Sequence, residues 1–206
     1  QNNRTQYSSP VQIPGAGWKK IGGYTSGSSA AIKTDNTLWM WGVNAYGMAA
    51  QNTSPQVKYG YSSPVQVPGT TWASFGIQGT GNMLAVKTDG TLWAWGDGPR
   101  GQLGQNESDI KRSSPVQIPG TTWSVDSFSN GELARANLAL KTDGTLWAWG
   151  YNVNGRLAQF DAGTNNGPWS SATHRSSPTQ IPGTTWNGTV SGAYMMGATK
   201  TDGTMW

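Results

Sequence analysis

The chain contains few side chains that could carry out acid–base, nucleophilic or metal chemistry. His174 is the only histidine, and there is no cysteine among the 206 residues. A catalytic triad would have to use His174, and neither a two-histidine nor a thiolate metal site can be formed. Glu107 and Asp109 come nearest to the clustered carboxylates of a calcium loop. We therefore predict no catalytic residue, no metal site and no cofactor, in a protein that is not an enzyme.

The residues that could bind a partner are basic or aromatic. One or two basic residues precede each Ser-Ser-Pro sequence, and equivalent units would place them on one rim: Arg4, Lys58, Lys111, Arg112 and Arg175. One loop is longer than its equivalents; it covers residues 159–175 and contains Phe160, Trp169 and His174. Long loops on rigid frameworks often bind partners. The alternatives stay open: the charges can be merely solubilising, and the aromatic rings can fold back under the loop.

The net charge and the low content of charged residues favour some classes of binding partner over others. The net charge is +4, and charged residues make up 12% of the chain, against about 25% in an average protein. A positive rim would suit an acidic glycan, a phosphate or an acidic protein. Nucleic acid is not an expected partner, because its binding usually requires denser clusters of Lys and Arg. No apolar run reaches about 18 residues, so membrane insertion is not expected either.

The framework that must position these residues is a tandem repeat. Lys-Thr-Asp-Gly-Thr-Leu-Trp stands at 87–93 and 141–147, with near-copies at 33–39 and 200–206, so its starts are 54, 54 and 59 residues apart. A second phrase, Ser-Ser-Pro-Val-Gln-Ile-Pro-Gly, keeps step at Ser8–Gly15, Ser62–Gly69, Ser113–Gly120 and Ser176–Gly183, with single exchanges. A fixed period near 50 residues indicates a repeat architecture. We therefore treat residues 1–206 as a single repeat domain.

Each unit is predicted to contain four short strands. In Pro64–Gly96 the run Pro-Val-Gln-Val-Pro is extended, and Trp72–Ile77, Met83–Thr88 and Thr91–Gly96 follow it. No stretch shows the 3.6-residue apolar period of a helix. The sequence therefore predicts an all-β chain.

An Asp-Gly or Asp-Asn pair separates the last two runs of every unit. Such a pair between apolar runs favours a hairpin with a two-residue type I′ turn. We expect these turns at Asp35-Asn36, Asp89-Gly90, Asp143-Gly144 and Asp202-Gly203.

The last strand of a unit is apolar on both faces. Leu92 and Ala94 share one face, and Trp93 and Trp95 share the other. A sheet that lies between two neighbouring sheets requires this pattern, and four-stranded units in tandem are typical of a β-propeller. We expect four indoles to be largely buried between blades: Trp93, Trp95, Trp147 and Trp149.

The combined phrases have a family resemblance. Lys-Thr-Asp-Gly-Thr-Leu-Trp-Ala-Trp-Gly at 87–96, Gly-Gln-Leu-Gly at 101–104 and the phrase at 113–120 resemble the regulator of chromosome condensation repeat. The resemblance covers essentially the whole chain and implies a β-propeller, commonly seven-bladed. The residues of these phrases are more similar to the bacterial and phage versions of the repeat. Gly-Gln-Leu-Gly becomes Gly-Met-Ala-Ala at 47–50 and Gly-Arg-Leu-Ala at 155–158. These alanines put the local turn geometry in question.

Both ends of the chain fall inside a unit. Gln1 stands where a residue after Gly-Gln-Leu-Gly belongs, and Trp206 stands inside the fourth Trp-containing strand. We therefore expect four units of a six- or seven-bladed array, taken from a longer chain. Further blades, or another copy of the chain, are expected at the ends.

Three classes of function remain. The first is a non-enzymatic structural or interaction module on a virion (tail fibre, tip or capsid decoration) or on a bacterial cell surface. It would bind other protein subunits or a surface receptor, including a glycan. The second, a guanine nucleotide exchange factor for a small GTPase, is implied by the family resemblance alone. The third is a carbohydrate-binding propeller. The near-identity of the units favours the first class, with a virion or extracellular location.

Overall fold

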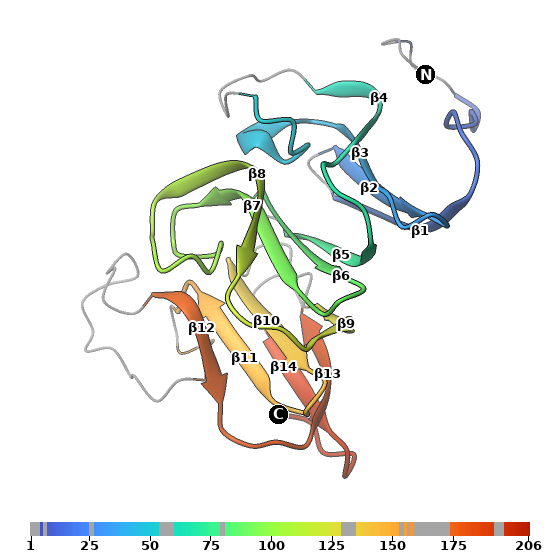
Figure 1. Cartoon of the computed structure of the whole chain (residues 1–206). Coiled ribbons are helices and arrows are strands. Elements are labelled where there is room, and N and C mark those ends of the chain that lie inside the picture. Colours follow the sequence, from blue (N-terminus) through green and yellow to red (C-terminus); the bar gives the residue numbers. More distant parts are fainter. Residues whose placement is uncertain are drawn as a thin grey trace.

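The regular secondary structure in the described part of the chain is almost entirely β-strand (Figure 1). The computed structural model describes residues 5, 8–24, 27–53, 60–78, 81–128, 135–152, 155, 157–158, 174–191 and 196–206. Within these residues there are fourteen strands and one short 3-10 turn, η1 (Ala45–Gly47). No helix in them has the length and apolar character needed to cross a membrane.

The strands form four antiparallel sheets, which we call blades one to four. Blade one contains β1 (Trp18–Tyr24), β2 (Ser28–Lys33), β3 (Leu38–Gly42) and β4 (Tyr61–Gln66). Blade two contains β5 (Trp72–Gln78), β6 (Asn82–Lys87), β7 (Leu92–Gly98) and β8 (Ile110–Ile118). Blade three contains β9 (Trp123–Phe128), β10 (Ala136–Lys141), β11 (Leu146–Gly150) and β12 (Arg175–Ile181). Blade four contains β13 (Trp186–Ser191) and β14 (Met196–Lys200), with a single further bridge between Thr199 and Met205.

The Ser-Ser-Pro phrase ends a sheet and does not begin one. β4, β8 and β12 contain the phrase, and each pairs with the strand before it, as in Trp39 opposite Gln66 and Trp93 opposite Gln117. The unit expected at Pro64–Gly96 is therefore shifted by one strand. Loops flank the phrase on both sides, so the period gives the length of a repeat but not the strand at which a sheet starts. The position suits the proline, because β4, β8 and β12 are edge strands.

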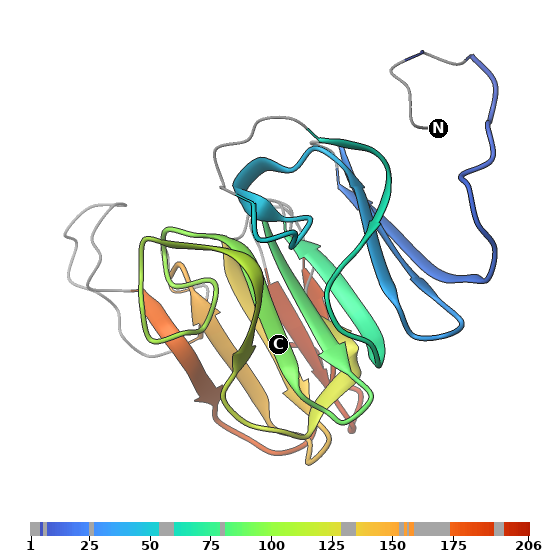
Figure 2. The same ribbon diagram turned by 45° about the horizontal axis from the view of Figure 1, so that its top comes forward.

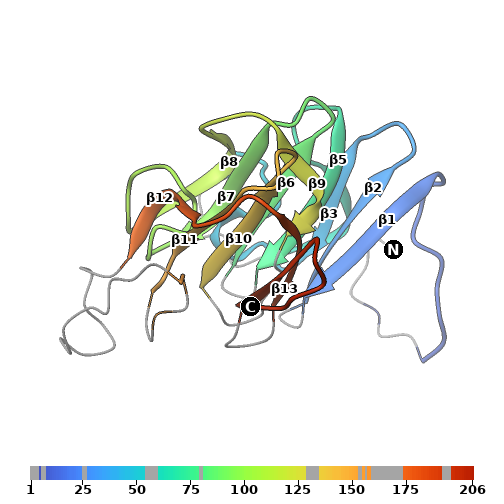
Figure 3. The same ribbon diagram turned by 90° about the horizontal axis from the view of Figure 1, so that it is seen from below.

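The blades follow one another along an arc, as the four-stranded propeller blades expected from the sequence should (Figures 1 and 2). The first strands of successive blades contact one another: β1 contacts β5, β5 contacts β9, and β9 contacts β13. Seen from below, the sheets fan out from this inner row, with β8 and β12 at the outside (Figure 3). The all-β fold is therefore a set of propeller blades with β1, β5, β9 and β13 innermost.

The hairpins form where the sequence predicts them, but with a different turn. In blade two the Gly90 amide donates to the Lys87 carbonyl at 3.0 Å, and only Gly90 of the pair has a positive φ, +77°. This is a three-residue loop that ends in a left-handed residue, so the type I′ turn was the wrong expectation. Asp89 Oδ1 accepts hydrogen bonds from the side chain and backbone of Thr91, at 2.7 and 3.0 Å. These two bonds lower the pKa of Asp89.

A lysine packs between two tryptophans at the hairpin end of every blade. Lys87 Nζ lies 5.0 Å from the ring centroid of Trp72 and 4.3 Å from that of Trp93. Trp72 also contacts Trp95, with 6.0 Å between ring centroids. Lys33, Lys141 and Lys200 occupy the same place in the other blades. Cation–π contacts of this kind are worth about 0.5–2 kcal/mol each.

The tryptophan positions agree with the prediction of burial between blades. Trp95 and Trp149 are fully buried. Trp93 and Trp147 are partly buried, and each indole Nε1 donates to the threonine two residues before it. They stay partly accessible because they lie next to the hairpin.

Apolar side chains fill the seams between blades. In the first seam, between blades one and two, Met40 and Met48 pack with Phe75 and Trp95. In the second seam, between blades two and three, the cluster contains Leu84, Val86, Leu92, Ala94, Leu103, Ile118, Trp123, Ala139 and Trp149. Leu92 and Ala94 thus face blade three while Trp95 faces blade one, as the alternation predicts.

We predict that Gly144→Ala destabilises the chain more than Gly203→Ala. Both glycines hold the left-handed turn position, with φ of +80° and +84°. Either alanine is strained there by about 1–2 kcal/mol. A Cβ at Gly144 would also overlap the Thr184 carbonyl in the next blade, whereas a Cβ at Gly203 has no neighbour within 4 Å. The overlap should add about 1–3 kcal/mol. Equal losses in urea unfolding would contradict this role for the turn.

We also predict a larger loss of stability for Trp95→Ala than for Trp93→Ala. Trp95 is fully buried in the first seam, so its truncation should cost about 3–5 kcal/mol. Trp93 is a matched control, because it lies two residues away in the same strand and is only partly buried. The free energies of unfolding from urea titrations measure the difference. Similar losses for the two variants would show that burial in the seam does not decide the cost.

Candidate functional site at the loop end of the blades

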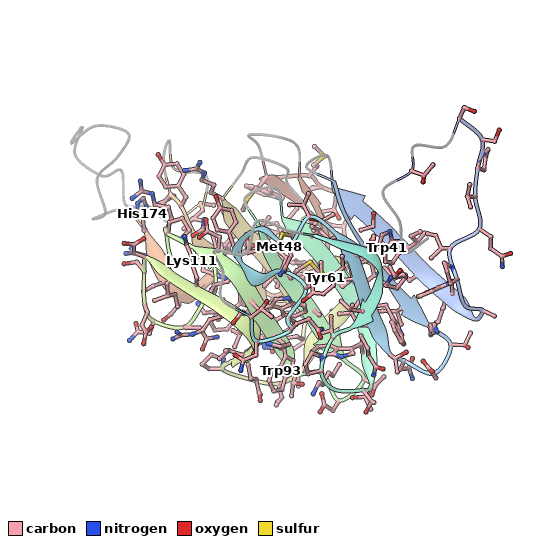
Figure 4. The ribbon with its side chains drawn as sticks, turned by 90° about the horizontal axis from the view of Figure 1, so that it is seen from above. Trp41, Met48, Tyr61, Trp93, Lys111 and His174 are labelled. Carbon is pink, nitrogen blue, oxygen red and sulfur yellow. The ribbon has the colours of Figure 1, made fainter. Side chains whose placement is uncertain are left out.

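Every blade has a hairpin end and a loop end. The Asp-Gly turns lie at the hairpin end, together with Trp93 (Figure 4). The long connections between the third and fourth strands lie at the loop end, where β4, β8 and β12 begin. Figure 4 shows His174 and Lys111 near each other at this end and away from Trp93.

The loops of blades one and two are each fastened to the next blade by a buried hydrogen bond. Trp95 Nε1 in blade two donates to the Met48 carbonyl of blade one at 2.6 Å. Trp149 Nε1 in blade three donates to the Gln102 carbonyl of blade two at 2.8 Å. The same carbonyl also accepts a bond from Asn137 Nδ2 at 2.6 Å. Each loop is therefore held in place by the indole of its neighbour.

The loops also lie directly on the outer strands of the next blade. A Cβ at Gly47 would come within 2.7 Å of Ser113 Cβ, and a Cβ at Gly101 would come as close to Ser176 Cα. The two backbones are hydrogen-bonded: the Asn52 amide donates to the Ser113 carbonyl at 2.9 Å, and Asn106 repeats this bond to Ser176 at 2.8 Å. The glycines are required because no side chain fits between loop and strand.

The alanines that replace the second glycine of Gly-Gln-Leu-Gly do not change the turn. Ala50, Gly104 and Ala158 all have left-handed φ, of 58°, 66° and 50°. Each amide donates to the carbonyl three residues earlier at 2.9–3.0 Å. The question raised by the sequence is thus answered: alanine adopts the left-handed conformation in place of glycine.

Four of the eight predicted binding residues belong to the described part of the chain. Lys111 and Arg112 lie at the start of β8, and His174 and Arg175 at the start of β12, so all four are at the loop end. Arg112 forms an exposed ion pair with Glu107 at 3.0 Å. The other four predictions lie outside the described residues: Arg4, Lys58, Phe160 and Trp169.

The predicted symmetry of the basic rim holds only in part. Arg112 and Arg175 are equivalent, because each pairs with the glycine that follows the second tryptophan of the third strand. In blade one Tyr61 occupies this position. Arg4 and Lys58 stand four residues before their Ser-Ser-Pro phrases, whereas Arg112 and Arg175 stand directly before theirs, so the sequence positions are not equivalent.

Three equivalent positions at each seam differ in chemical type between blades. In the first seam they hold Tyr46 from the loop, Asp97 near the end of β7 and Lys111 in the outer strand β8. Lys111 Nζ lies 4.8 Å from the Tyr46 ring centroid, and Lys111 stands opposite Asp97 in the β7–β8 register. Burial raises the pKa of Asp97, and the positive charges of Lys111 and Arg135 oppose this shift. The first seam therefore combines a cation, an anion and an aromatic ring.

The second seam holds different residues at the same positions: Arg100, Tyr151 and His174. The ring centroids of Tyr151 and His174 are 4.9 Å apart, and the Arg100 guanidinium lies 5.9 Å from the Tyr151 ring. Burial lowers the pKa of His174, and the charge of Arg100 lowers it further. Tyrosine thus replaces the carboxylate of the first seam, and two basic groups face one ring.

The sequence-based prediction missed Tyr46, Asp97, Arg100 and Tyr151. These residues could have been found by aligning the repeat units with one another. Tyr46 and Arg100 precede the first glycine of the loop phrase, and Asp97 and Tyr151 follow the glycine after the second tryptophan. They were missed because the search looked for charges before Ser-Ser-Pro and for an unusual loop. Among the described residues, no group of three or more His, Cys, Asp or Glu side chains could hold a metal ion.

An apolar groove marks the outer face of blade one. It is lined by Ile13, Trp18, Lys19, Lys20, Ile21, Ala31 and Trp41. Ile21 is 69% exposed, whereas Phe75, at the equivalent place in blade two, packs against Gly22 of blade one and is 5% exposed. The groove therefore corresponds to a surface that the preceding blade covers in blade two.

Comparisons with known proteins agree with this fold. The family model for the regulator of chromosome condensation (RCC1) repeat matches residues 89–128. The human E3 ubiquitin-protein ligase HERC2 is 28% identical over 137 residues, which are 63% of this chain and 3% of that protein. The protein RCC2 homolog of Xenopus laevis is 32% identical over 116 residues, which are 55% of this chain and 21% of that protein.

Solved structures of the same fold are also larger than this chain. Human WBSCR16 superposes with a TM-score of 0.69 at 19% identity, over 87% of this chain and 44% of that one. Prp20p from Saccharomyces cerevisiae, whose binding to Gsp1p and histones is described with its structure, superposes with a TM-score of 0.71 at 16% identity, over 89% of this chain and 44% of that one. The chain thus spans less than half of each neighbour. The motifs, the family match and the fold together show a β-propeller of RCC1 repeats.

We predict that the chain loses stability as the pH falls through about 6.5, the ordinary pKa of histidine. The folded environment lowers the pKa of His174, so the unfolded state takes up the proton first and is favoured by acid. His174→Gln should flatten this part of the profile, and Arg100→Gln should flatten it partly. Urea midpoints at several pH values measure the effect. A His174→Gln profile that matches the unsubstituted chain between pH 7.5 and 5.5 would contradict it.

Proposed function

We propose that this propeller of RCC1 repeats is a non-enzymatic protein-binding module that contacts its partner through the loop end. One observation carries the proposal: the blades agree at the hairpin end and differ at the loop end. Tyr46 and Arg100 occupy one equivalent position, and Lys111 and His174 another. The phrase Lys-Thr-Asp-Gly-Thr-Leu-Trp, which forms the hairpin of each blade, is nearly the same in all four blades. Positions that change between blades of one chain can instead distinguish one side of a partner from another.

The known members that resemble this chain support a protein partner. The structure of Prp20p is described with its binding to Gsp1p and histones, and another structure holds the same yeast protein bound to Kap60. We propose other protein subunits or a surface receptor as the partner class for this chain. The groove on blade one, which includes Ile21 and Trp41, is proposed to be covered by a further blade or another copy. Assignment to a virion or cell surface, in a bacterial or phage version of the repeat, stays a prediction from the sequence, as does a glycan receptor.

Exchange of guanine nucleotides is the second candidate. It is favoured by the structural similarity to Prp20p and by the binding of that protein to Gsp1p. Fold similarity at 16% identity shows the fold alone, so this candidate requires its own assay.

Site-specific photo-crosslinking tests the proposed binding surface. A photoreactive residue at Arg112 or Arg175 samples the loop end, and one at Asp89 or Asp143 samples the hairpin end as a matched control. We expect a discrete crosslinked protein from extracts of the source organism at the loop-end positions only. Equal crosslinking at both ends, or crosslinking at the hairpin end alone, would contradict the assignment. Faster release of labelled GDP from Gsp1p in the presence of the chain would instead move the proposal to an exchange factor.

A further inference from the structure

The second seam contains buried donor groups without acceptors. Within the part of the chain that the structure describes, Arg100 Nε, Gln102 Nε2 and both ring nitrogens of His174 are buried and have no hydrogen-bond partner. A neutral imidazole has one N–H donor and a protonated imidazole has two. Burying such donors without partners costs free energy, so each of them needs an explanation.

These groups lie close together and are held in place. The Arg100 amide donates to Gln102 Oε1 at 2.6 Å, which keeps the Gln102 side chain beside Arg100. The Arg100 guanidinium and the His174 ring both contact Tyr151, at 5.9 and 4.9 Å. Burial lowers the pKa of the His174 ring, and the nearby charge of Arg100 lowers it further. Arg100 and His174 therefore lie at the Tyr151 ring, with Gln102 beside Arg100.

The first seam has a carboxylate at the equivalent place in the blade. There Lys111 takes the place of His174, and Asp97 stands opposite it in the sheet register. In the second seam Tyr151 takes the place of Asp97, so the carboxylate is missing from the equivalent position. The second seam thus has the cationic Arg100 beside His174 and lacks, at this position, the carboxylate that the first seam has.

We infer that Arg100, His174 and Gln102 form an oxyanion-binding site that takes a carboxylate or phosphate group from an acidic segment of a protein partner. Such a group would accept bonds from Arg100 Nε and from the His174 ring, as charge-assisted pairs that are stronger than neutral hydrogen bonds. It would replace the anion that Asp97 provides in the first seam. The inference rests on the proposed protein-binding function and names the chemistry that the loop end recognises.

The single histidine makes the test specific. His174 gives the only histidine ring signals in an NMR spectrum of the intact chain, and it is itself part of the site. Inorganic phosphate should shift these signals in a saturable way at constant ionic strength, while sodium chloride should not. Bound phosphate should also raise the pKa of His174, because its negative charge opposes the charge of Arg100 near the ring.

Matched variants separate the site from general charge effects. Arg100→Gln should weaken phosphate binding by roughly tenfold or more, since it removes a charge-assisted bond. Arg100→Lys keeps the charge, and it replaces Arg100→Gln in the phosphate titration if the glutamine variant does not fold. Lys111→Gln changes the equivalent position in the first seam and should leave binding unchanged. Unshifted His174 signals, or equal titrations for Arg100→Gln and the unsubstituted chain, would overturn the inference.

Peptides distinguish the two sources of the anion. A glutamate-rich peptide and a phosphoserine peptide of the same length are titrated against the chain, with a serine-only peptide as control. Saturation by the first shows carboxylate recognition, and saturation by the second alone shows phosphate recognition. Binding of neither peptide would overturn recognition of a protein segment. Phosphate binding is measured without a partner, so its failure is distinct from a failure of the crosslinking experiment, which tests the proposed function.

Discussion

Each complete sheet of this protein is apolar on both faces, so it is stable only between neighbours. A surface of that kind in water would favour association. Blades two and three have both faces buried against a neighbouring sheet, and Trp95 and Trp149 mark the faces that point backward along the chain. The indole N–H of each of these residues also donates a hydrogen bond to a backbone carbonyl in the loop of the preceding blade, which restrains that loop. The same tryptophans therefore pack the blades together and fix the loops at the loop end.

Much of the fold could be predicted because it depends on local patterns that recur. The Asp-Gly pairs specify hairpins, and alternation along Leu92–Trp95 specifies two buried faces. The type of turn was missed because Thr91 stabilises Asp89 within a longer loop, and this bond is a property of the folded hairpin. The first strand of each sheet was missed for a different reason. The repeat period is the same wherever counting begins, so it does not show which strand starts a sheet. The pairing of β4 with β3 shows that the Ser-Ser-Pro strand is the last of its sheet.

The candidate site was less predictable, because it is formed by three segments that are distant in the sequence. Lys111, Arg112, His174 and Arg175 were found from their place before Ser-Ser-Pro. Arg100 and Tyr151 come from a loop and a strand end, and no local motif connects them with His174. Their proximity follows from the docking of each loop on the next blade. Comparing the repeats position by position within the one chain would have brought them to notice, since Tyr46 aligns with Arg100 and Asp97 aligns with Tyr151.

The docking of loop on outer strand also has a direction. Blade one supplies Met48 and receives Trp95, and blade two supplies Gln102 and receives Trp149, so donor and acceptor surfaces differ. In the language of symmetry this contact is heterologous, and heterologous contacts repeat indefinitely unless their rotation brings the last unit back to the first. A duplicated unit therefore carries both halves of its own interface and can enter the series without any compensating substitution. That property makes duplication of whole units an easy route of growth, and it leaves the loop-end positions as the place where the copies can diverge.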